Sequence, residues 1–207
     1  VTVHKAKTSL LVIILIAVIV RLAVAVYLGD GVERSLDEYS YSALAARLAN
    51  GHGYSFDRGW YPFTPTEMPT AHWSFLYTAF VAGIYAMAGV HPLVVRLIQA
   101  VMGGVLLPWL TYRLARRLFP GREGLGLVAA GCTAVYAFFI LFGVQLMTET
   151  FYIAALLWSL ERTMVLIGSE RNRRYSGEYG TTNPSTIRSL RPSPTAAPTT
   201  WYCPLPQ

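Results

Sequence analysis

Charged residues are scarce in this sequence, and cysteine is scarcer still. Only 14% of the 207 residues are charged, whereas an average soluble domain carries about 25%. This shortage excludes a disordered acidic tail and a coiled coil. The two cysteines, Cys132 and Cys203, form neither a disulfide framework nor a zinc cluster. The sequence also lacks a P-loop, a G-x-G-x-x-G loop and a nucleophile elbow, so nothing points to the enzyme classes that these motifs mark.

Apolar residues are abundant instead, and they come in long blocks. They make up 54% of the chain and gather at residues 9–29, 71–90, 93–112, 124–147 and 150–167. At 1.5 Å per residue the first block is about 31 Å long, which matches a hydrocarbon core of about 30 Å. It is too long for a signal-peptide core and no A-x-A site follows it, so we expect an uncleaved span. The sequence therefore predicts an all-α integral membrane protein.

Basic residues predict which blocks cross the membrane, because Lys and Arg collect on cytoplasmic flanks. Lys5 and Lys7 place the N-terminus inside, so the acid-rich loop 30–70 lies outside. If residues 71–90 form an interfacial helix on the outer face, every basic cluster is cytoplasmic, including Arg113, Arg116, Arg117 and Arg122. We therefore expect about four transmembrane helices, at 9–29, 93–112, 124–147 and 150–167, plus outer-loop helices. Five spans, with 71–90 crossing, is the alternative.

The outer loop contains a helix signal followed by a proline-rich stretch. Ser35 and Glu38 have the spacing of a capping box, and Gly51 supplies a stop. Residues 54–69 hold three prolines among aromatic side chains, so we expect an extended loop there.

The chain changes character at about residue 169. Residues 1–168 form the transmembrane region, whereas 169–207 are rich in Ser, Thr, Pro, Arg and Gly and hold six of the twelve prolines. This composition predicts a disordered tail. A native cytoplasmic tail, a truncated chain and a frameshifted end all agree with it.

Four acids are the candidate chemical groups. Asp37 and Glu38 begin the outer-loop helix, Glu67 precedes the interfacial helix, and Glu149 stands at the outer junction of two spans. A bundle brings them to one membrane level, where carboxylates can bind a metal or act as a general base. Each also has a structural interpretation, because acids at helix N-termini complement the helix dipole.

Two arginines lie inside or at the edge of predicted spans. Arg21 and Arg96 can extend toward the outer interface or pair with an anionic lipid phosphate, and the sequence leaves both readings open. Gly103 and Gly104 predict close helix packing.

Several short motifs occur in an order that resembles a known family. After the first span come Asp37-Glu38-Tyr39-Ser40-Tyr41 and Gly51-His52-Gly53-Tyr54, an aromatic-proline loop, Val95-Arg96-Leu97, Leu114-Ala115-Arg116-Arg117 and Thr148-Glu149-Thr150-Phe151. Over residues 9–167 the chain resembles the N-terminal part of membrane glycosyltransferases of the C superfamily, family-39 type. That group includes protein O-mannosyltransferases and the bacterial aminoarabinose lipid A transferase.

The resemblance implies a glycosyltransferase that moves a hexose or pentose from a polyprenyl-phosphate donor to a protein or lipid acceptor. The site would face the extracytoplasmic side of the plasma (inner) membrane. Asp37 would act as the base or orient the acceptor, with Glu38 beside it and Glu149 as a second acid. Glu67 matches a carboxylate that binds a divalent metal in the aminoarabinose transferase. Arg96 and Arg21 would bind the donor phosphate, because the leaving phosphate needs cationic partners.

Family members are longer, so this chain is expected to be the N-terminal part and inactive alone.

Two other functions stay open. A transporter or permease fragment explains the spans but needs no acid-rich, aromatic outer loop. A non-catalytic membrane subunit explains all the features without any chemistry.

Overall fold

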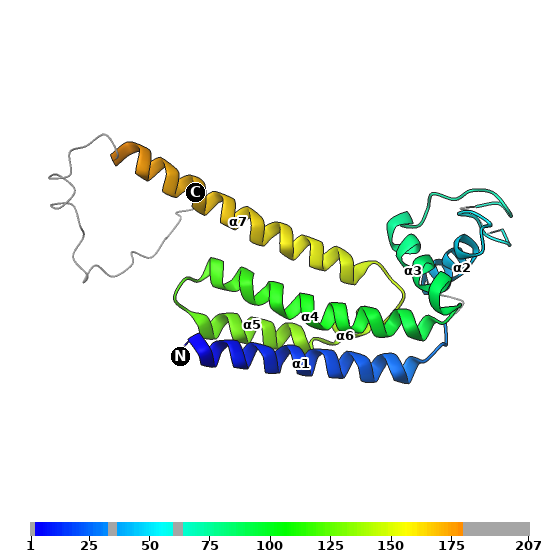
Figure 1. The fold of residues 1–207 in the computed structure, drawn as a ribbon, viewed down its shortest axis with the longest axis horizontal. Helices are drawn as coiled ribbons and strands as arrows, with labels where there is room; N and C mark the ends of the chain where they lie inside the picture. Colours follow the sequence, from blue (N-terminus) through cyan, green and yellow to red (C-terminus); the bar gives the residue numbers. More distant parts are fainter. Residues whose placement is uncertain (1–2, 33–36, 60–63, 180–207) are drawn as a thin grey trace, which may run out of the picture. The chain divides into compact units, whose positions relative to one another are not determined.

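The computed structural model describes residues 3–32, 37–59 and 64–179, and these residues are mainly helical (Figure 1). The helices described are α1 (Val3–Leu28), α2 (Asp37–Ala49), α3 (Phe75–Ala88), α4 (Pro92–Leu118), α5 (Glu123–Val135), α6 (Ala137–Leu141) and α7 (Glu149–Tyr179). Turns and an isolated β-bridge between Ser55 and Pro69 connect them. The predicted all-α fold class is confirmed.

Contacts divide the chain into two units, residues 1–164 and 165–207. In the described part of the second unit, α7 continues to Tyr179. The helix thus extends past residue 169, where the sequence predicted the tail to begin, through a stretch without proline. The disordered tail stays a prediction. Residues 180–207 lie outside the described residues. The sites described below lie in the first unit.

Among the described residues, three helices are long and apolar enough to cross a membrane. They contain the segments Lys5–Leu28, Pro92–Leu118 and Glu149–Glu170, which correspond to the predicted spans 9–29, 93–112 and 150–167. The helices α1, α4 and α5 lie side by side (Figure 1). A Cβ added to Gly104 of α4 would lie 2.8 Å from Val18 Cγ2 of α1, so the predicted close packing at this glycine is confirmed.

The block predicted as a span at 124–147 is not one helix. It breaks at Tyr136, whose φ of −66° and ψ of 119° are extended, between α5 and α6. At 1.5 Å per residue, the 13 residues of α5 are about 20 Å long, shorter than a hydrocarbon core of about 30 Å. A break inside a membrane-embedded segment leaves backbone carbonyls without helical partners, and these need hydrogen-bond donors from the protein. The side chain of Arg21 provides such donors, as described below.

The outer-loop elements lie near their predicted positions. The helix α2 ends at Ala49, and Gly51 has the positive φ of 78° that glycine tolerates. The predicted cap Ser35 lies outside the described residues. The helix α3 has 14 residues, about 21 Å, so it is too short to cross alone. The side of the membrane on which it lies remains a prediction.

Candidate functional site

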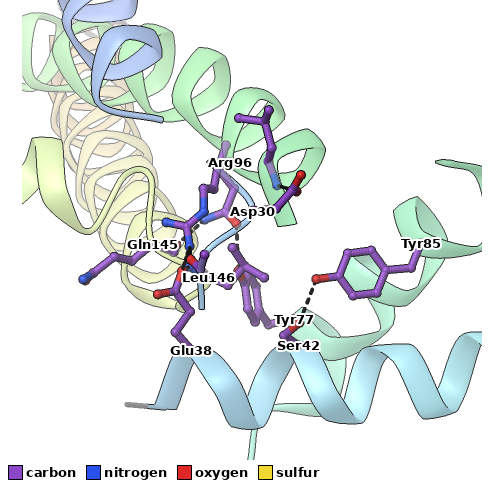
Figure 2. Close-up of polar contacts among 11 residues, drawn as sticks. Asp30, Glu38, Ser42, Tyr77, Tyr85, Arg96, Gln145 and Leu146 are labelled. Carbon is purple, nitrogen blue, oxygen red and sulfur yellow. Dashed lines mark hydrogen bonds and ion pairs between the residues drawn. The ribbon is translucent and has the colours of Figure 1, made fainter. Parts of the chain in front are cut away.

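A buried ion pair joins α2 to α4 (Figure 2). Glu38 Oε1 and Arg96 Nη2 are 2.8 Å apart, and their side chains are only 5% and 1% exposed. The same Glu38 oxygen accepts a hydrogen bond from the Leu146 backbone N–H at 3.0 Å, and Arg96 also donates to the Gly31 carbonyl. Buried charges persist only when they are paired and hydrogen-bonded. The pair therefore fixes the start of α2 against α4 and the segment before α7.

Further polar contacts surround this pair. Gln99 accepts a hydrogen bond from Tyr77 at 2.7 Å and donates to the Gln145 carbonyl at 3.1 Å. In Figure 2 the Tyr85 hydroxyl points toward Ser42, 2.9 Å from its Oγ. These contacts connect α2, α3, α4 and the segment before α7. Both the orientation of α2 and the position of its first acids therefore depend on several elements.

Arg96 has unused hydrogen-bonding capacity. Among the described residues, its Nε and Nη1 groups are buried and have no hydrogen-bond partner. A buried donor without a partner costs free energy, so such groups call for an explanation. An anionic group reaching this point would satisfy both donors.

The carboxylates of Asp37 and Glu149 both act on the hydroxyl of Tyr41. Burial is the main cause that raises the pKa of Tyr41, and the two carboxylates raise it further. Hydrogen bonds from the Ser74 backbone and the Thr148 side chain oppose this effect. Asp37 is exposed at the first turn of α2. Two acids that are 112 positions apart in the sequence thus both lie near enough to one tyrosine to raise its pKa.

One carboxylate oxygen of Glu149 is unpartnered. Its Oε2 atom is buried and has no hydrogen-bond partner among the described residues. Because Glu149 is the first residue of α7, the helix dipole favours its negative charge. The structural role expected for a helix-start acid is therefore present, yet it leaves one acceptor free for a ligand.

An apolar cavity of about 700 Å³ lies beside the start of α7, where Glu149 stands. Its lining comes from α3, the start of α7 and the residues before each: Ser74, Leu76, Tyr77, Phe80, Thr148, Phe151, Tyr152 and Ala155. Ser74 and Thr148 also bond to Tyr41, so the polar end of the cavity meets the tyrosine whose pKa the two acids raise. A cavity that is apolar along most of its length and polar at one end suits an amphiphilic ligand.

Glu67 does not join this group. Its carboxylate contacts Arg47 Nη2 at 2.7 Å, and its backbone has a φ of 60°, rare for a residue with a side chain. Within residues 3–32, 37–59 and 64–179, the structure contains no cluster of three or more His, Cys, Asp or Glu that would hold a metal. A carboxylate that faces a guanidinium does not fit the metal role implied for Glu67, and we derive no step through a metal.

Arg21 has a different neighbourhood from Arg96. Its guanidinium is fully buried and donates to the carbonyls of Ala17 at 3.0 Å, Ala134 at 3.1 Å and Thr133 at 3.4 Å. Thr133 and Ala134 are the residues just before the break at Tyr136. Arg21 therefore satisfies carbonyls that the broken helix exposes, a role that neither reading of the sequence included.

Sequence reasoning missed Tyr41 and Gln99 at this site, and Glu161 at the other end of α4. Gln99 carried a signal, because an amide in an apolar span needs a partner. Glu161 carried one too, as an acid inside the predicted span 150–167. It is fully buried and contacts Arg113 at 2.8 Å. Tyr41 had no signal beyond its place one turn after Asp37.

The family can be read from the region that contains the cavity. Residues 68–177, more than half of the chain, match the profile of the family described as dolichyl-phosphate-mannose-protein mannosyltransferase. The chain belongs to this mannosyltransferase family. The recognition made from the short motifs is thereby confirmed, and the chain is a membrane protein of a glycosyltransferase family that uses polyprenyl-phosphate sugar donors.

The matched range has a definite relation to the site. It includes Arg96, Glu149 and all the cavity residues, whereas Asp37 and Glu38 precede it. No curated protein and no solved structure matched the chain. Roles for individual residues therefore rest on the geometry described above and on the family's chemistry.

Proposed function

We propose that this protein transfers a sugar from a polyprenyl-phosphate donor to a hydroxyl or amine of a protein or lipid acceptor, on the extracytoplasmic face of the plasma (inner) membrane. The observation that carries the proposal is the apolar cavity at the start of α7, where Glu149 has an unpartnered carboxylate oxygen and where Asp37 is near enough to raise the pKa of Tyr41 together with Glu149. The cavity suits the isoprenoid part of the donor. Its polar end would then receive the sugar phosphate beside two carboxylates.

In the proposed reaction, an acceptor O–H or N–H attacks the anomeric carbon of the sugar. Asp37 accepts the proton from the attacking group, as a general base, or orients that group. The bond between the anomeric carbon and the phosphate oxygen breaks, and its electron pair leaves with the polyprenyl phosphate. Glu149 has a free carboxylate oxygen that can bind a sugar hydroxyl.

Arg96 is the cation we assign to the leaving phosphate. Its two unpartnered donors are preorganised because Glu38 holds the third side of the guanidinium. Fixed donors aimed at developing charge stabilise a transition state more than mobile ones do. Glu38 then acts as a positioning residue. Arg21 is the weaker candidate for the phosphate, since backbone carbonyls already occupy its Nη1 and Nη2 groups and only Nε is left without a partner.

The extracytoplasmic location follows from the distribution of basic residues. The helix α4 begins near Arg96 and ends at Arg113, Arg116 and Arg117. Positive residues mark the cytoplasmic side, so the end that carries Asp37, Arg96 and Glu149 would face outward. A cysteine introduced at Arg122 should be protected from impermeant thiol reagents in intact cells, and labelling there would contradict this topology.

The test is transfer of a radiolabelled sugar from a polyprenyl-phosphate donor by the intact protein, with Asp37→Asn compared with wild type. Asparagine keeps the shape and removes the base, so the rate should fall about 10²–10⁴-fold. Asp57→Asn is the matched control, because Asp57 is an exposed acid of the same loop. Glu149→Gln should also be impaired, while the thermal stability of Asp37→Asn stays near that of wild type.

Two outcomes would contradict the assignment. Near-normal transfer by Asp37→Asn would return Asp37 to the structural role of a helix-start acid. Absence of transfer by the folded full-length wild-type protein with hexosyl and pentosyl donors would favour the non-catalytic subunit.

A further inference from the structure

A second cavity lies at the opposite end of α4. Its volume is about 270 Å³, and its lining residues are Tyr112, Arg113, Arg116 and Arg117. Helical rise separates Arg113 from Arg96 by about 25 Å along α4. The cavity is therefore separate from the candidate site, and the proposed reaction gives it no role.

The arginines of this cavity outnumber the acids that pair with them. Glu161, fully buried on α7, contacts Arg113 at 2.8 Å and Arg117 at 3.4 Å, while Glu123 contacts Arg116 at 3.4 Å. Three guanidinium groups thus share two carboxylates. The side chains of Arg113, Arg116 and Arg117 remain 34%, 49% and 50% exposed, so they can bind another anion.

Other cations lie at the same helix ends. The helices α1 and α4 meet at Val18 and Gly104 and run in opposite directions (Figure 1). The start of α1 therefore lies at the end of the unit where α4 finishes, and it brings Lys5 and Lys7. Arg122 lies in the turn between α4 and α5. This concentration of positive charge attracts anions to the mouth of the cavity.

Aromatic rings place the cavity at the level of lipid headgroups. Arg113 lies 4.8 Å from the ring centre of Trp109, and Arg116 lies 5.6 Å from that of Tyr112. Trp and Tyr collect at the boundary between hydrocarbon and water. Because the apolar part of α4 ends here, an anion in the cavity would sit where phospholipid phosphates lie.

We propose that this cavity binds the phosphate of an anionic phospholipid. Planar guanidinium groups match phosphate oxygens with paired N–H donors. Glu161 holds two of these groups from the protein side, so they need not be ordered when the lipid arrives. Basic pockets between helices on the cytoplasmic side of membrane proteins have the chemistry for such headgroups.

The test is native mass spectrometry of the intact protein in detergent, titrated with phosphatidylglycerol, phosphatidylcholine or inorganic phosphate. Arg116→Gln removes a lining cation without touching the buried Glu161. Arg122→Gln removes one charge at the same end but outside the lining, and serves as its control. Retention of phosphatidylglycerol should weaken about fivefold in Arg116→Gln, as expected for one basic residue near a membrane surface. Arg122→Gln should change it less than twofold.

Three results would overturn the proposal. Equal retention of phosphatidylcholine would show that the anionic charge is irrelevant. Displacement of the lipid by an equal concentration of inorganic phosphate would identify a free-phosphate site instead. Equal weakening in both variants would show a general charge effect. Arg117→Lys is a further control in case Arg117→Gln fails to fold, because lysine keeps the positive charge and lacks only the paired N–H donors of the guanidinium. It should weaken retention of phosphatidylglycerol less than Arg117→Gln does.

Discussion

An ion pair between arginine and glutamate lies at each end of α4, and the two ends differ in how far the arginine is buried. At one end, Arg96 and Glu38 are both buried, and each charge has the other as its partner. At the other end, Glu161 is buried while Arg113 and Arg117 are one-third to one-half exposed. The first pair excludes water from both charges. In the second, the arginines keep a solvated side that can bind another group.

This difference shows how one residue type serves two purposes. A buried pair costs desolvation free energy that its own attraction barely offsets, so the Arg96–Glu38 pair is poor at adding stability. It is well suited to holding a cation in one orientation at a site. The half-exposed arginines lose less hydration, and they stay available to ligands from outside the protein.

The largest expected effect comes from breaking each pair in turn with the same substitution. Glu38→Ala leaves Arg96 buried and unpaired, which should cost about 3–5 kcal/mol of unfolding free energy. Glu161→Ala leaves two arginines that water can solvate, so the loss should be about 1–3 kcal/mol, the value of hydrogen bonds to charged groups. Thermal unfolding of both variants in one detergent measures the difference.

A double variant separates charge from packing in that comparison. Glu38→Ala combined with Arg96→Met removes the unpaired cation and should recover much of the stability lost in Glu38→Ala. If Glu161→Ala proves as harmful as Glu38→Ala, exposure does not distinguish the two ends.

The helix joining the two ends offers a second, smaller test. A Cβ at Gly104 would lie 2.8 Å from Val18 Cγ2 and 2.9 Å from Val18 Cα. The Cα belongs to the backbone of α1, so a change of side-chain rotamer cannot relieve this contact. Gly104→Ala should therefore cost about 1–3 kcal/mol through overpacking. Gly131→Ala in α5 is the matched control, because nothing lies within 4 Å of its added Cβ. Equal melting temperatures for the two variants would show that α1 and α4 separate easily.

The sequence predicted well what depends on local pattern. Long apolar segments gave α1, α4 and α7, and the acids of the first turn together with Gly51 gave α2. It failed at Tyr136, where the helix breaks without proline or glycine. The break depends on Arg21, 113 positions away from its partner Ala134, and no pattern within a single block shows such a contact.

The candidate site, too, could be predicted from the sequence only where it depends on local pattern. The importance of acids near Asp37 and Glu149 was readable because helix starts and span junctions are visible in the sequence. The division of labour between Asp37 and Glu38 was not, because the pattern of α2 gives both acids the same place in its first turn. Only the position of Arg96 and of the Leu146 backbone N–H shows that Glu38 points inward.

The smallest effect concerns Tyr41, the buried tyrosine whose pKa Asp37 and Glu149 both raise. Tyr41→Phe removes hydrogen bonds with Ser74 and Thr148, so it should cost about 0.5–1.5 kcal/mol at neutral pH.

The pKa of Tyr41 is raised in the folded protein, chiefly by burial and then by Asp37 and Glu149. A raised pKa means that the folded state holds its proton more tightly than the unfolded state. Its contribution is therefore complete below about pH 10, the ordinary pKa of tyrosine, and is lost as the pH rises above that value. Unfolding free energies of wild type and Tyr41→Phe should converge between about pH 10 and the folded pKa. A difference that stays constant through this range would show that the pKa of Tyr41 is not raised in the folded protein.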